Sequence, residues 1–241
     1  MKTLVIIQAR MGSTRLPGKI LKPLGESVVL DYVFSRCKKV NGVFDVIVAT
    51  STLPQDNAVE AWCEKNEVTC FRGSQDDVLS RYYEAAKPYQ PDYVIRVTSD
   101  CPFVDFELMA QIIETMKVQP VDYVKVVGSL PRGLTSEMFA FSALEYMHEH
   151  GNEERHREHV TYYAYEFSDE FQHVTLKAPK EIQNPSLRIT LDTEEDYELC
   201  TKVAEHFNGD KLISSAKVVE YLEAHPEVAK INAHIEQKPV K

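Results

Sequence analysis

The sequence predicts an α/β fold, built on a mostly parallel sheet with helices on both faces. Short β-rich runs alternate with helical patterns four times over about 125 residues, which is typical of βαβ units. The first run, 4–7, is apolar on both faces, as a strand in the middle of a parallel sheet should be. Hydrophobic residues make up 44% of the 241 residues, a fraction that is ordinary for a folded globular protein.

The elements of the first half follow in order along the chain. Strands are expected at 4–7, 46–49, 68–72, 93–97 and 122–127. Between them, apolar residues recur at helical spacing at 29, 30, 33, 34 and 37, at 59, 62 and 63, at 78, 79, 82, 83 and 86, and at 108, 109, 112, 113 and 116. Ligands of such sheets bind beyond the carboxyl ends of the strands. The loops after residues 7, 49, 72, 97 and 127 are therefore the candidate functional loops.

The alternation ends after residue 128. A turn is expected at 130–133, a short strand at 138–141 and a helical stretch at 142–167. Further strands at 173–176 and 187–191 precede helices at about 194–207 and 215–224. No Ser/Gly linker, repeat or low-complexity tract divides the chain, so we expect a single domain over 1–241, with one half at 1–128 and an elaborated half at 129–232.

Charge and cysteine content exclude several classes of function. The 27 Lys and Arg against 37 Asp and Glu give a net charge of −10, which argues against binding to nucleic acid or to a membrane surface. The five cysteines are odd in number and show no CxxC spacing, so reduced thiols are expected rather than disulfides or zinc. No apolar run suits a signal peptide or a membrane span, and we expect a cytoplasmic protein.

The loop after the first strand concentrates positive charge in this acidic chain. Arg10, Arg15 and Lys19 share it with Gly12 and Gly18. Glycines let backbone N–H groups approach a ligand, arginines can fork onto phosphate oxygens, and lysine adds a point charge, a combination that suits a polyphosphate. The pattern is not a P-loop, because five residues separate the glycines and no hydroxyl residue follows the lysine. A basic surface loop with turn glycines is the alternative interpretation.

Two carboxylates follow expected strands at the ligand edge. Asp100 comes just after the strand at 93–97, and Asp192 just after the expected strand at 187–191. Mg²⁺ favours a few carboxylates together with substrate phosphate oxygens and water. Both residues could instead cap helices, a role that is compatible with binding a metal.

These segments together resemble a known family along nearly the whole chain. Residues 8–19 are similar to the signature loop of the sugar nucleotidyltransferases that activate sugar acids with CTP, the KDO and acylneuraminate cytidylyltransferases. The run IIQARMGSTRLPGKILKPL resembles most the spore coat polysaccharide biosynthesis protein F branch. The resemblance implies a Rossmann-like domain of the nucleotidyltransferase (nucleotide-diphospho-sugar transferase) type, in which this loop wraps the CTP phosphates. It implies nucleotide contacts from Gln8, Ala9, Arg10, Gly12, Ser13, Arg15 and Lys19.

The resemblance also implies the metal ligands. Asp100 matches the aspartate of the family's (G/S)-D-x-P turn, and Asp192 matches that of its D-x-x-E-D segment; both would hold Mg²⁺. Ser99 stands where many relatives have glycine. Asp196 is either a third participant or a solvent-facing helix residue. Arg15, Lys19, Asp100 and Asp192 are then the expected catalytic residues.

Two further regions are expected to bind substrate. By the same resemblance, Arg72 and Asp77 lie near the base and ribose of the nucleotide. For the nearby Arg81, an ion pair with acids on its own helix is an equal alternative. Arg132 and Glu137 would contact the sugar, with Arg132 pairing with a carboxylate or phosphate. The pair His156 and His159 would also contact the acceptor; a charged helix face is the alternative.

The expected activity is the transfer of CMP from CTP to a sugar acid or related sugar, with release of pyrophosphate, for surface polysaccharide synthesis. The half at 1–128 would bind the nucleotide, and the half at 129–232 would bind the sugar and complete the metal site. The alternatives are a nucleotidyltransferase that uses another NTP and a sugar 1-phosphate, or a catalytically silent nucleotide-binding subunit. The aromatic run at 162–167 fits either a homodimer interface or a core helix.

Overall fold

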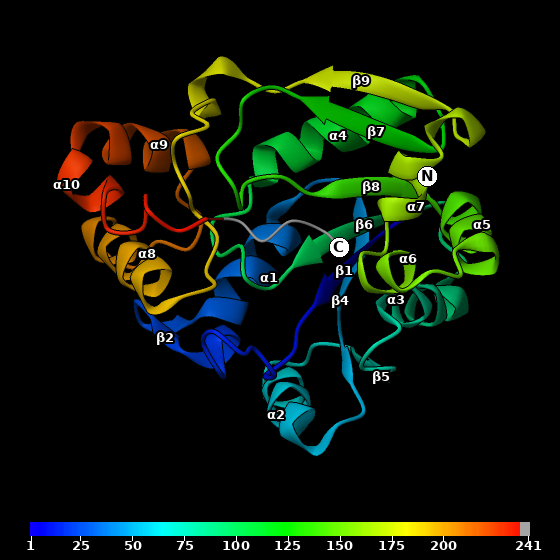
Figure 1. The fold of residues 1–241 in the computed structure, drawn as a ribbon, viewed down its shortest axis with the longest axis horizontal. Coiled ribbons are helices and arrows are strands. Elements are labelled where there is room, and N and C mark those ends of the chain that lie inside the picture. The colour runs from blue at the N-terminus through cyan, green and yellow to red at the C-terminus, as the bar shows by residue number, and fades with distance from the viewer. Residues whose placement is uncertain (237–241) are drawn as a thin grey trace.

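The sheet at the centre of the molecule has seven strands in the order β5-β4-β1-β6-β8-β7-β9 (Figure 1). The computed structural model describes residues 1–236. Within it the strands are β1 (Thr3–Gln8), β4 (Val43–Ser51), β5 (Cys70–Gly73), β6 (Tyr93–Thr98), β7 (Tyr123–Val127), β8 (Glu137–Ala140) and β9 (His173–Lys177). Strand β8 runs antiparallel to both of its neighbours, and every other pairing is parallel. The predicted mostly parallel sheet is confirmed.

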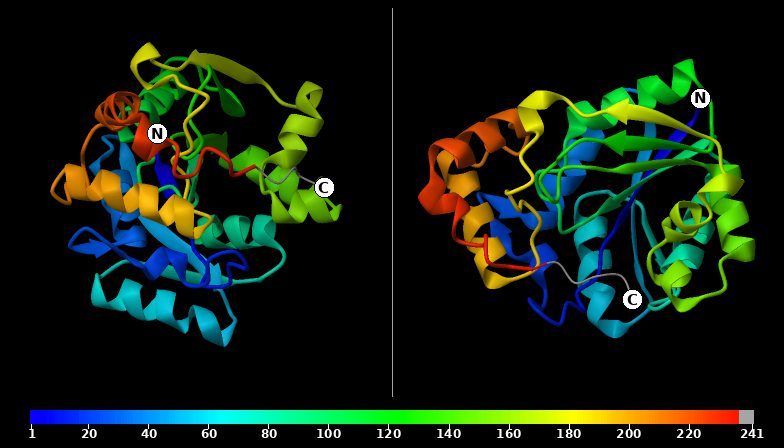
Figure 2. Two further views of the ribbon diagram at one scale, coloured as in Figure 1. Left: turned by 60° about the vertical axis from the view of Figure 1, so that its left-hand side comes forward. Right: turned by 45° about the horizontal axis from the view of Figure 1, so that its top comes forward.

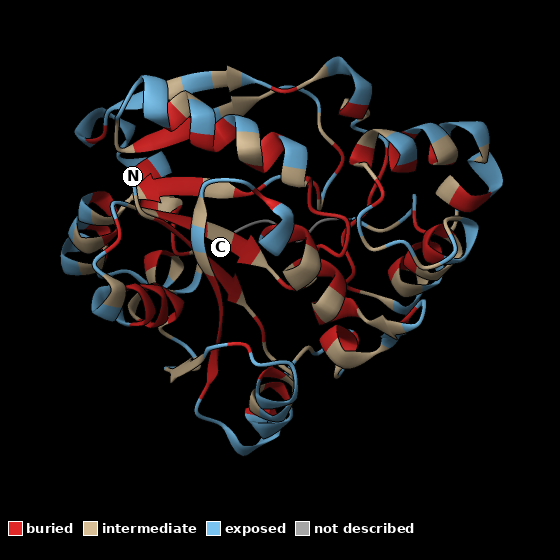
Figure 3. Ribbon diagram, turned by 180° about the vertical axis from the view of Figure 1, so that it is seen from behind, coloured by how far each residue is buried: buried red, intermediate tan, exposed pale blue. Residues whose placement is uncertain are grey.

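Helices cover both faces of this sheet, which explains why residues 4–7 of β1 are all apolar. Val5 and Ile7 pack on one side with α1 (Val29–Lys39), α2 (Asn57–Lys65) and α4 (Phe106–Val118). Leu4 and Ile6 pack on the other side with α3 (Val78–Ala86) and α5 (Phe141–His150). Figure 3 shows the central strands buried and the outer faces of the helices exposed. A strand covered on both faces has no polar side, so the continuous apolar run at 4–7 follows directly from the layering.

The second half adds two groups of helices on opposite sides of the molecule (Figures 1 and 2). The first comprises α5, α6 (Glu154–Glu158) and α7 (Tyr162–Glu166), and the second α8 (Glu194–His206), α9 (Ser215–Ala224) and α10 (Pro226–Ala229). The expected helical stretch at 142–167 is thus three helices. It breaks after α5 at Gly151 and again at Val160, whose φ of 35° no helix continues.

The strand predicted at 187–191 is wrong. Leu187, Ile189 and Leu191 are buried as a strand's residues would be, but the segment forms no ladder and makes only an isolated bridge, Arg132 to Arg188. Its backbone is satisfied by loops instead: Ile189 N donates to Arg132 O at 2.9 Å, and Leu191 N donates to Asp100 O at 2.8 Å. The apolar alternation therefore reports burial under the loop at the end of β6, not pairing with a strand.

Smaller elements complete the fold. The hairpin of β2 (Pro23–Leu24) and β3 (Ser27–Val28) was not predicted. Five 3₁₀ turns among the described residues connect larger elements: η1 (Lys19–Leu21), η2 (Pro54–Asp56), η3 (Lys87–Tyr89), η4 (Ser168–Glu170) and η5 (Lys180–Ile182). Strands from both halves share the one sheet, while the single-domain boundary itself stays a prediction. Within residues 1–236, no helix combines the length and apolar character needed to cross a bilayer.

Candidate active site

The loop after β1 is held in a defined shape by hydrogen bonds of its backbone and by one buried side chain. Met11 N donates to the buried carboxylate of Asp56 at 2.7 Å, and Gly18 N donates back to Met11 O at 3.0 Å. Leu16 inserts into the core and is 2% exposed. Gly18 closes the turn at a φ of +69°, a conformation that favours glycine. This anchoring leaves the charged side chains of the loop projecting from a fixed frame.

Two of these cations meet the two aspartates predicted to act together. The Lys19 ammonium donates to Asp100 Oδ2 at 3.0 Å, to Asp192 Oδ1 at 2.8 Å and to the carbonyl of Leu191 at 2.8 Å. The Arg15 guanidinium lies 3.0 Å from the same Asp192 Oδ1. The chain therefore brings the loop of β1, the turn after β6 and the segment before α8 to one point.

The charges at this point stabilise one another. Burial alone would lower the pKa of Lys19, but Asp100 and Asp192 outweigh burial and raise that pKa above its ordinary value. Burial alone would raise the pKa of Asp100, yet Lys19 and the hydroxyl of Thr98 bring it below its ordinary value. At neutral pH the ammonium is therefore protonated and the Asp100 carboxylate is ionised.

The segment that carries Asp192 lies against the β7–β8 connection at a backbone contact that only glycine permits. Gly133 has a φ of +97°, and a Cβ there would come within 2.7 Å of Thr190 N and 2.8 Å of Ile189 C and O. Because those are backbone atoms, they cannot rotate away as a side chain could. Arg132 is consequently presented on a turn whose position is tied to that of Asp192.

Asp196 does not face solvent, so the solvent-facing interpretation is wrong. It is fully buried, and the guanidinium of Arg188 bonds both of its oxygens, at 2.9 and 3.0 Å. Arg188 also bonds Asp192 Oδ2 at 2.9 Å. Asp196 acts here as a partner of Arg188, one turn away from the meeting point of Lys19 and Asp100.

Two neighbouring cavities open at this edge of the sheet, and both include Thr98 and Asp100 in their walls. The loop cavity, of about 390 Å³, lies under the loop after β1. Its lining includes all seven residues that the resemblance placed at the nucleotide, Gln8, Ala9, Arg10, Gly12, Ser13, Arg15 and Lys19. Arg10 donates to Gln75 O at 2.9 Å and so connects this loop to the one after β5.

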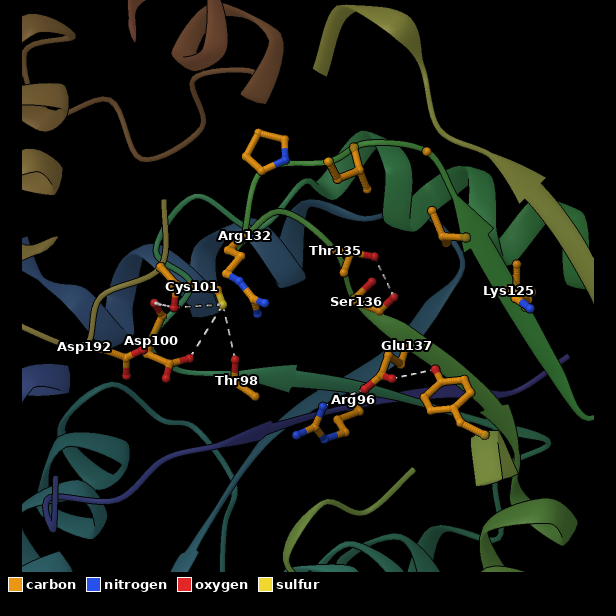
Figure 4. A pocket seen from close by; sticks show the side chains of 18 residues that line it. Arg96, Thr98, Asp100, Cys101, Lys125, Arg132, Thr135, Ser136, Glu137 and Asp192 are labelled. Atoms are coloured by element: carbon orange, nitrogen blue, oxygen red, sulfur yellow. Dashed lines mark hydrogen bonds and ion pairs between the residues drawn. The ribbon is translucent and has the colours of Figure 1, made fainter. Parts of the chain in front are cut away.

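The second cavity, of about 680 Å³, extends from the aspartates across β6, β8 and β7 and is called the acceptor cavity below. Figure 4 shows Asp100 and Asp192 at one end, Lys125 at the other and Arg132 between them. The predicted pair Arg132 and Glu137 both line this cavity.

The wall of the acceptor cavity carries hydrogen-bond donors without partners. The side chains of Lys125 and Arg132 form no hydrogen bond or ion pair with any residue in 1–236, and the buried hydroxyl of Ser136 has none either. The acidic group on this wall is already satisfied: Glu137 accepts from Arg96 at 2.6 Å and from Tyr165 at 2.6 Å. What remains unpaired in the cavity is donor capacity, which suits a ligand with anionic oxygens.

Arg72 and Asp77 are both engaged in contacts within the protein. Arg72 fastens the loop after β4 by donating to Ser51 O at 3.0 Å and by pairing with Glu60 at 2.6 Å. Asp77 caps α3 by accepting from Ser80 N at 2.8 Å. Asp77 also pairs with Arg157 of α6 at 3.5 Å. A role for either residue at the base stays a prediction.

His156 and His159 line neither cavity. His156 is 2% exposed, and its Nε2 lies 2.7 Å from Glu166 Oε2, an arrangement that joins α6 to α7. His159 pairs at 3.8 Å with Glu158, which does line the loop cavity. The histidines' role in substrate binding stays a prediction, as does the homodimer, for which the run at 162–167 offers the exposed side chains of Tyr165 and Phe167.

Sequence reasoning missed several residues that the fold brings to this edge. Arg96 and Lys125 are charged side chains inside otherwise apolar strands, Ile95-Arg96-Val97 and Val124-Lys125-Val126. A charged residue within such an apolar run indicates a candidate functional position. Arg188 lies four residues before Asp192, but the strand expected there did not predict that its guanidinium would contact Asp192 and Asp196. Asn232, which contacts Arg188 and Asp196 from the C-terminal segment, carried no local signal.

A mostly parallel sheet with an anchored, glycine-containing cationic loop at its carboxyl edge and two aspartates facing that loop is the architecture of a nucleotidyltransferase. Solved structures agree. A cytidylyltransferase from Leptospira borgpetersenii matches with a TM-score of 0.89 and 31% identity over 99% of this chain and 100% of that one. The CMP:2-keto-3-deoxy-manno-octonic acid synthetase complexed with CTP shares the fold, with a TM-score of 0.66 and 16% identity over 86% of this chain and 100% of that one.

Sequence comparison identifies the family. The cytidylyltransferase family model matches residues 4–233. The spore coat polysaccharide biosynthesis protein SpsF of Bacillus subtilis is 34% identical over 233 residues, which are 94% of this chain and 96% of that protein. The chain therefore belongs to the cytidylyltransferase family, as the residues at 8–19 predicted.

Proposed function

We propose that this enzyme transfers CMP from CTP to a hydroxyl group of an acidic sugar and releases pyrophosphate. The acceptor oxygen attacks the α-phosphorus of CTP, the bond from that phosphorus to the bridging oxygen of the β-phosphate breaks, and the hydroxyl proton passes to water. Membership of the cytidylyltransferase family supports the nucleotide, and the name of the Bacillus subtilis relative supports a product used for surface polysaccharide.

One observation carries this proposal: two cavities meet at Asp100, one lined by backbone and cations and the other by unpaired donors. A triphosphate in the loop cavity would be held by Arg10, Arg15 and Lys19. An acidic sugar in the acceptor cavity would pair with Arg132. Both reactants would then approach each other at the same carboxylate, and such positioning is a large part of catalysis of phosphoryl transfer.

The donor set at the meeting point fits Mg²⁺. The Lys19 ammonium already stands between Asp100 Oδ2 and Asp192 Oδ1, so the two oxygens attract a cation to that position. No cluster of three or more His, Cys, Asp or Glu side chains suited to a metal occurs within residues 1–236. Two carboxylates are what Mg²⁺ uses when phosphate oxygens and water complete its shell. A bound Mg²⁺ would neutralise charge that develops on the phosphates.

The residues of the chain have separate tasks in this scheme. Asp100 and Asp192 would hold the metal. Lys19, which lines the loop cavity, would then be released from them to contact the phosphates. Arg15 would contribute a second charge to the triphosphate. Arg132 would orient the sugar so that its reacting hydroxyl points toward Asp100.

A pyrophosphate-release assay across the four NTPs, each with a panel of sugar acids and with Mg²⁺, tests the proposal. We expect turnover with CTP and an acidic sugar, and loss of that turnover in Asp100→Ala. Turnover only with another NTP and a sugar 1-phosphate would overturn the choice of substrates. Calorimetric binding of CTP without turnover on any acceptor would indicate a silent binding subunit instead.

A further inference from the structure

Arg188 lies behind the candidate metal site, and it is buried, with 6% of its surface exposed. Within residues 1–236, its guanidinium makes the following three short contacts with carboxylate oxygens. Nε donates to Asp196 Oδ1 at 2.9 Å, and Nη2 donates to Asp196 Oδ2 at 3.0 Å and to Asp192 Oδ2 at 2.9 Å. One planar group therefore connects a fully buried carboxylate to a carboxylate of the site.

The orientation of Arg188 is fixed from behind. Asp196 is 0% exposed and accepts from Asp192 N at 2.9 Å and from Thr193 N at 3.1 Å, so it is locked to the start of α8. Asn232, 1% exposed, donates to Asp196 Oδ1 at 2.8 Å and to Arg188 O at 3.0 Å. With both of its neighbours held, the guanidinium cannot rotate without breaking several buried hydrogen bonds.

The two carboxylate oxygens of Asp192 have different partners. Its Oδ2 is engaged by Arg188, while its Oδ1 faces Lys19 at 2.8 Å and Arg15 at 3.0 Å. Lys19 is also 3.0 Å from Asp100 Oδ2. The carboxylate of Asp192 thus has one oxygen turned to the protein and one turned to the site.

We propose that Arg188 is a positioning residue, which fixes the rotation of the Asp192 carboxylate and makes it offer a single oxygen, Oδ1, toward Asp100. The inference rests on the proposed function, because it concerns how the chain presents a cation site to the nucleotide. Arg188 touches neither substrate; it acts through Asp192. Asp196 and Asn232 serve to hold Arg188.

The test must separate orientation from charge and from folding. Arg188→Lys keeps the charge but loses the fork that reaches both carboxylates. The double variant Arg188→Met/Asp196→Asn removes one charge of each sign, so its net charge is unchanged and no buried carboxylate is left unpaired. Arg36→Lys is the matched control: Arg36 is 0% exposed and donates to the carbonyls of Val104 at 2.7 Å and Ile213 at 2.8 Å, away from both cavities.

The first measurement is the affinity for Mn²⁺ in the presence of CTP and without acceptor, monitored by electron paramagnetic resonance. The second is kcat and KM for CTP. Loss of a partner behind a metal ligand typically weakens metal binding or activity by roughly 10- to 100-fold. We expect that loss in Mn²⁺ affinity and in kcat for both Arg188 variants, with KM for CTP changing less than kcat. Arg36→Lys should lower the melting temperature and leave Mn²⁺ affinity as in the parent.

Parental Mn²⁺ affinity in either folded Arg188 variant would overturn the inference, and so would an equal loss in Arg36→Lys, because the effect would then be a general loss of stability. Failure of the proposed function would look different: the parent itself would show no turnover of CTP. In that case the positioning role falls with the function on which it rests.

Discussion

The two ends of the acceptor cavity treat charge in opposite ways. At the aspartate end every ionised group has an internal partner, with Lys19 and Arg188 on the two oxygens of Asp192. Along the wall toward Lys125, the cations of Lys125 and Arg132 have no partner among residues 1–236. The charged groups of the first end are therefore paired without a ligand, whereas those of the second end would gain partners only when a ligand binds. Substitutions should therefore change stability and catalysis at the first end, and binding alone at the second.

The largest effect is expected where the internal pairing coincides with the chemistry. Asp100→Asn or Asp192→Asn should lower CTP turnover by about 100- to 1,000-fold, the scale on which loss of charge stabilisation acts in a transition state. The measurement is pyrophosphate release at saturating CTP. Asp169→Asn, at an exposed carboxylate of η4, is the control and should be fully active. Near-parental turnover in both aspartate variants would contradict the expectation that substitutions at the aspartate end change catalysis.

Asp196→Asn tests the pairing behind the site. Burial alone would raise the pKa of Asp196, but Arg188, the backbone of Asp192 and Asn232 bring it below the ordinary 3.8. A depressed carboxylate pKa contributes stability that is complete above the unfolded value and is lost as the pH falls through the folded one. The variant should be about 3 kcal/mol less stable at pH 7.

The same variant should approach the parent in stability as the pH falls below about 3.8, because the unfolded parent chain takes up a proton there, whereas the folded carboxylate, with its lower pKa, takes it up only at a still lower pH. Urea unfolding at several pH values measures this. A stability difference that stays constant down to pH 2 would show that the charge of Asp196 contributes nothing to stability. It would contradict the expectation that internal charge pairing stabilises the aspartate end.

Gly133→Ala sharpens the comparison at the junction of the two ends. An added methyl would meet the backbone of Ile189 and Thr190 at less than 3 Å, and at a φ of +97°, so we expect a loss of about 2 kcal/mol in the free energy of unfolding. Gly12→Ala is the control, because its methyl meets only the tip of the Gln55 side chain. Equal unfolding midpoints for the two variants would contradict the close backbone approach.

The smallest effect is expected at the unpaired wall. Arg132→Ala should raise the KM for an acidic acceptor about ten-fold, the loss of one charge-assisted contact of about 1.4 kcal/mol, and leave the KM for CTP unchanged. Because this side chain has no internal partner, the melting temperature should not fall. Lys125→Ala should act in the same direction. A drop in melting temperature with no change in acceptor KM would show that these side chains stabilise the fold and do not bind the acceptor.

The sequence was sufficient for those parts of the molecule that are set by local pattern. Strand and helix alternation located the parallel sheet, and the loop at 8–19 was informative because its glycines and cations lie within one connection. The parts that failed depend on contacts between distant segments. The buried run at 187–191 alternates like a strand, yet the carbonyls of Arg132 and Asp100 satisfy its backbone. Likewise, Asp196 was open to a solvent-facing interpretation because nothing local shows that Arg188 and Asn232 enclose it.

Lys19, placed between Asp100 and Asp192, has a practical consequence for handling the protein. Two carboxylates this close would repel each other, and many metal sites depend on a divalent ion to relieve that repulsion. Here a covalently attached ammonium already does so. Treatment with EDTA should therefore leave the melting temperature unchanged, and a chelator-washed preparation should regain full turnover as soon as magnesium is returned.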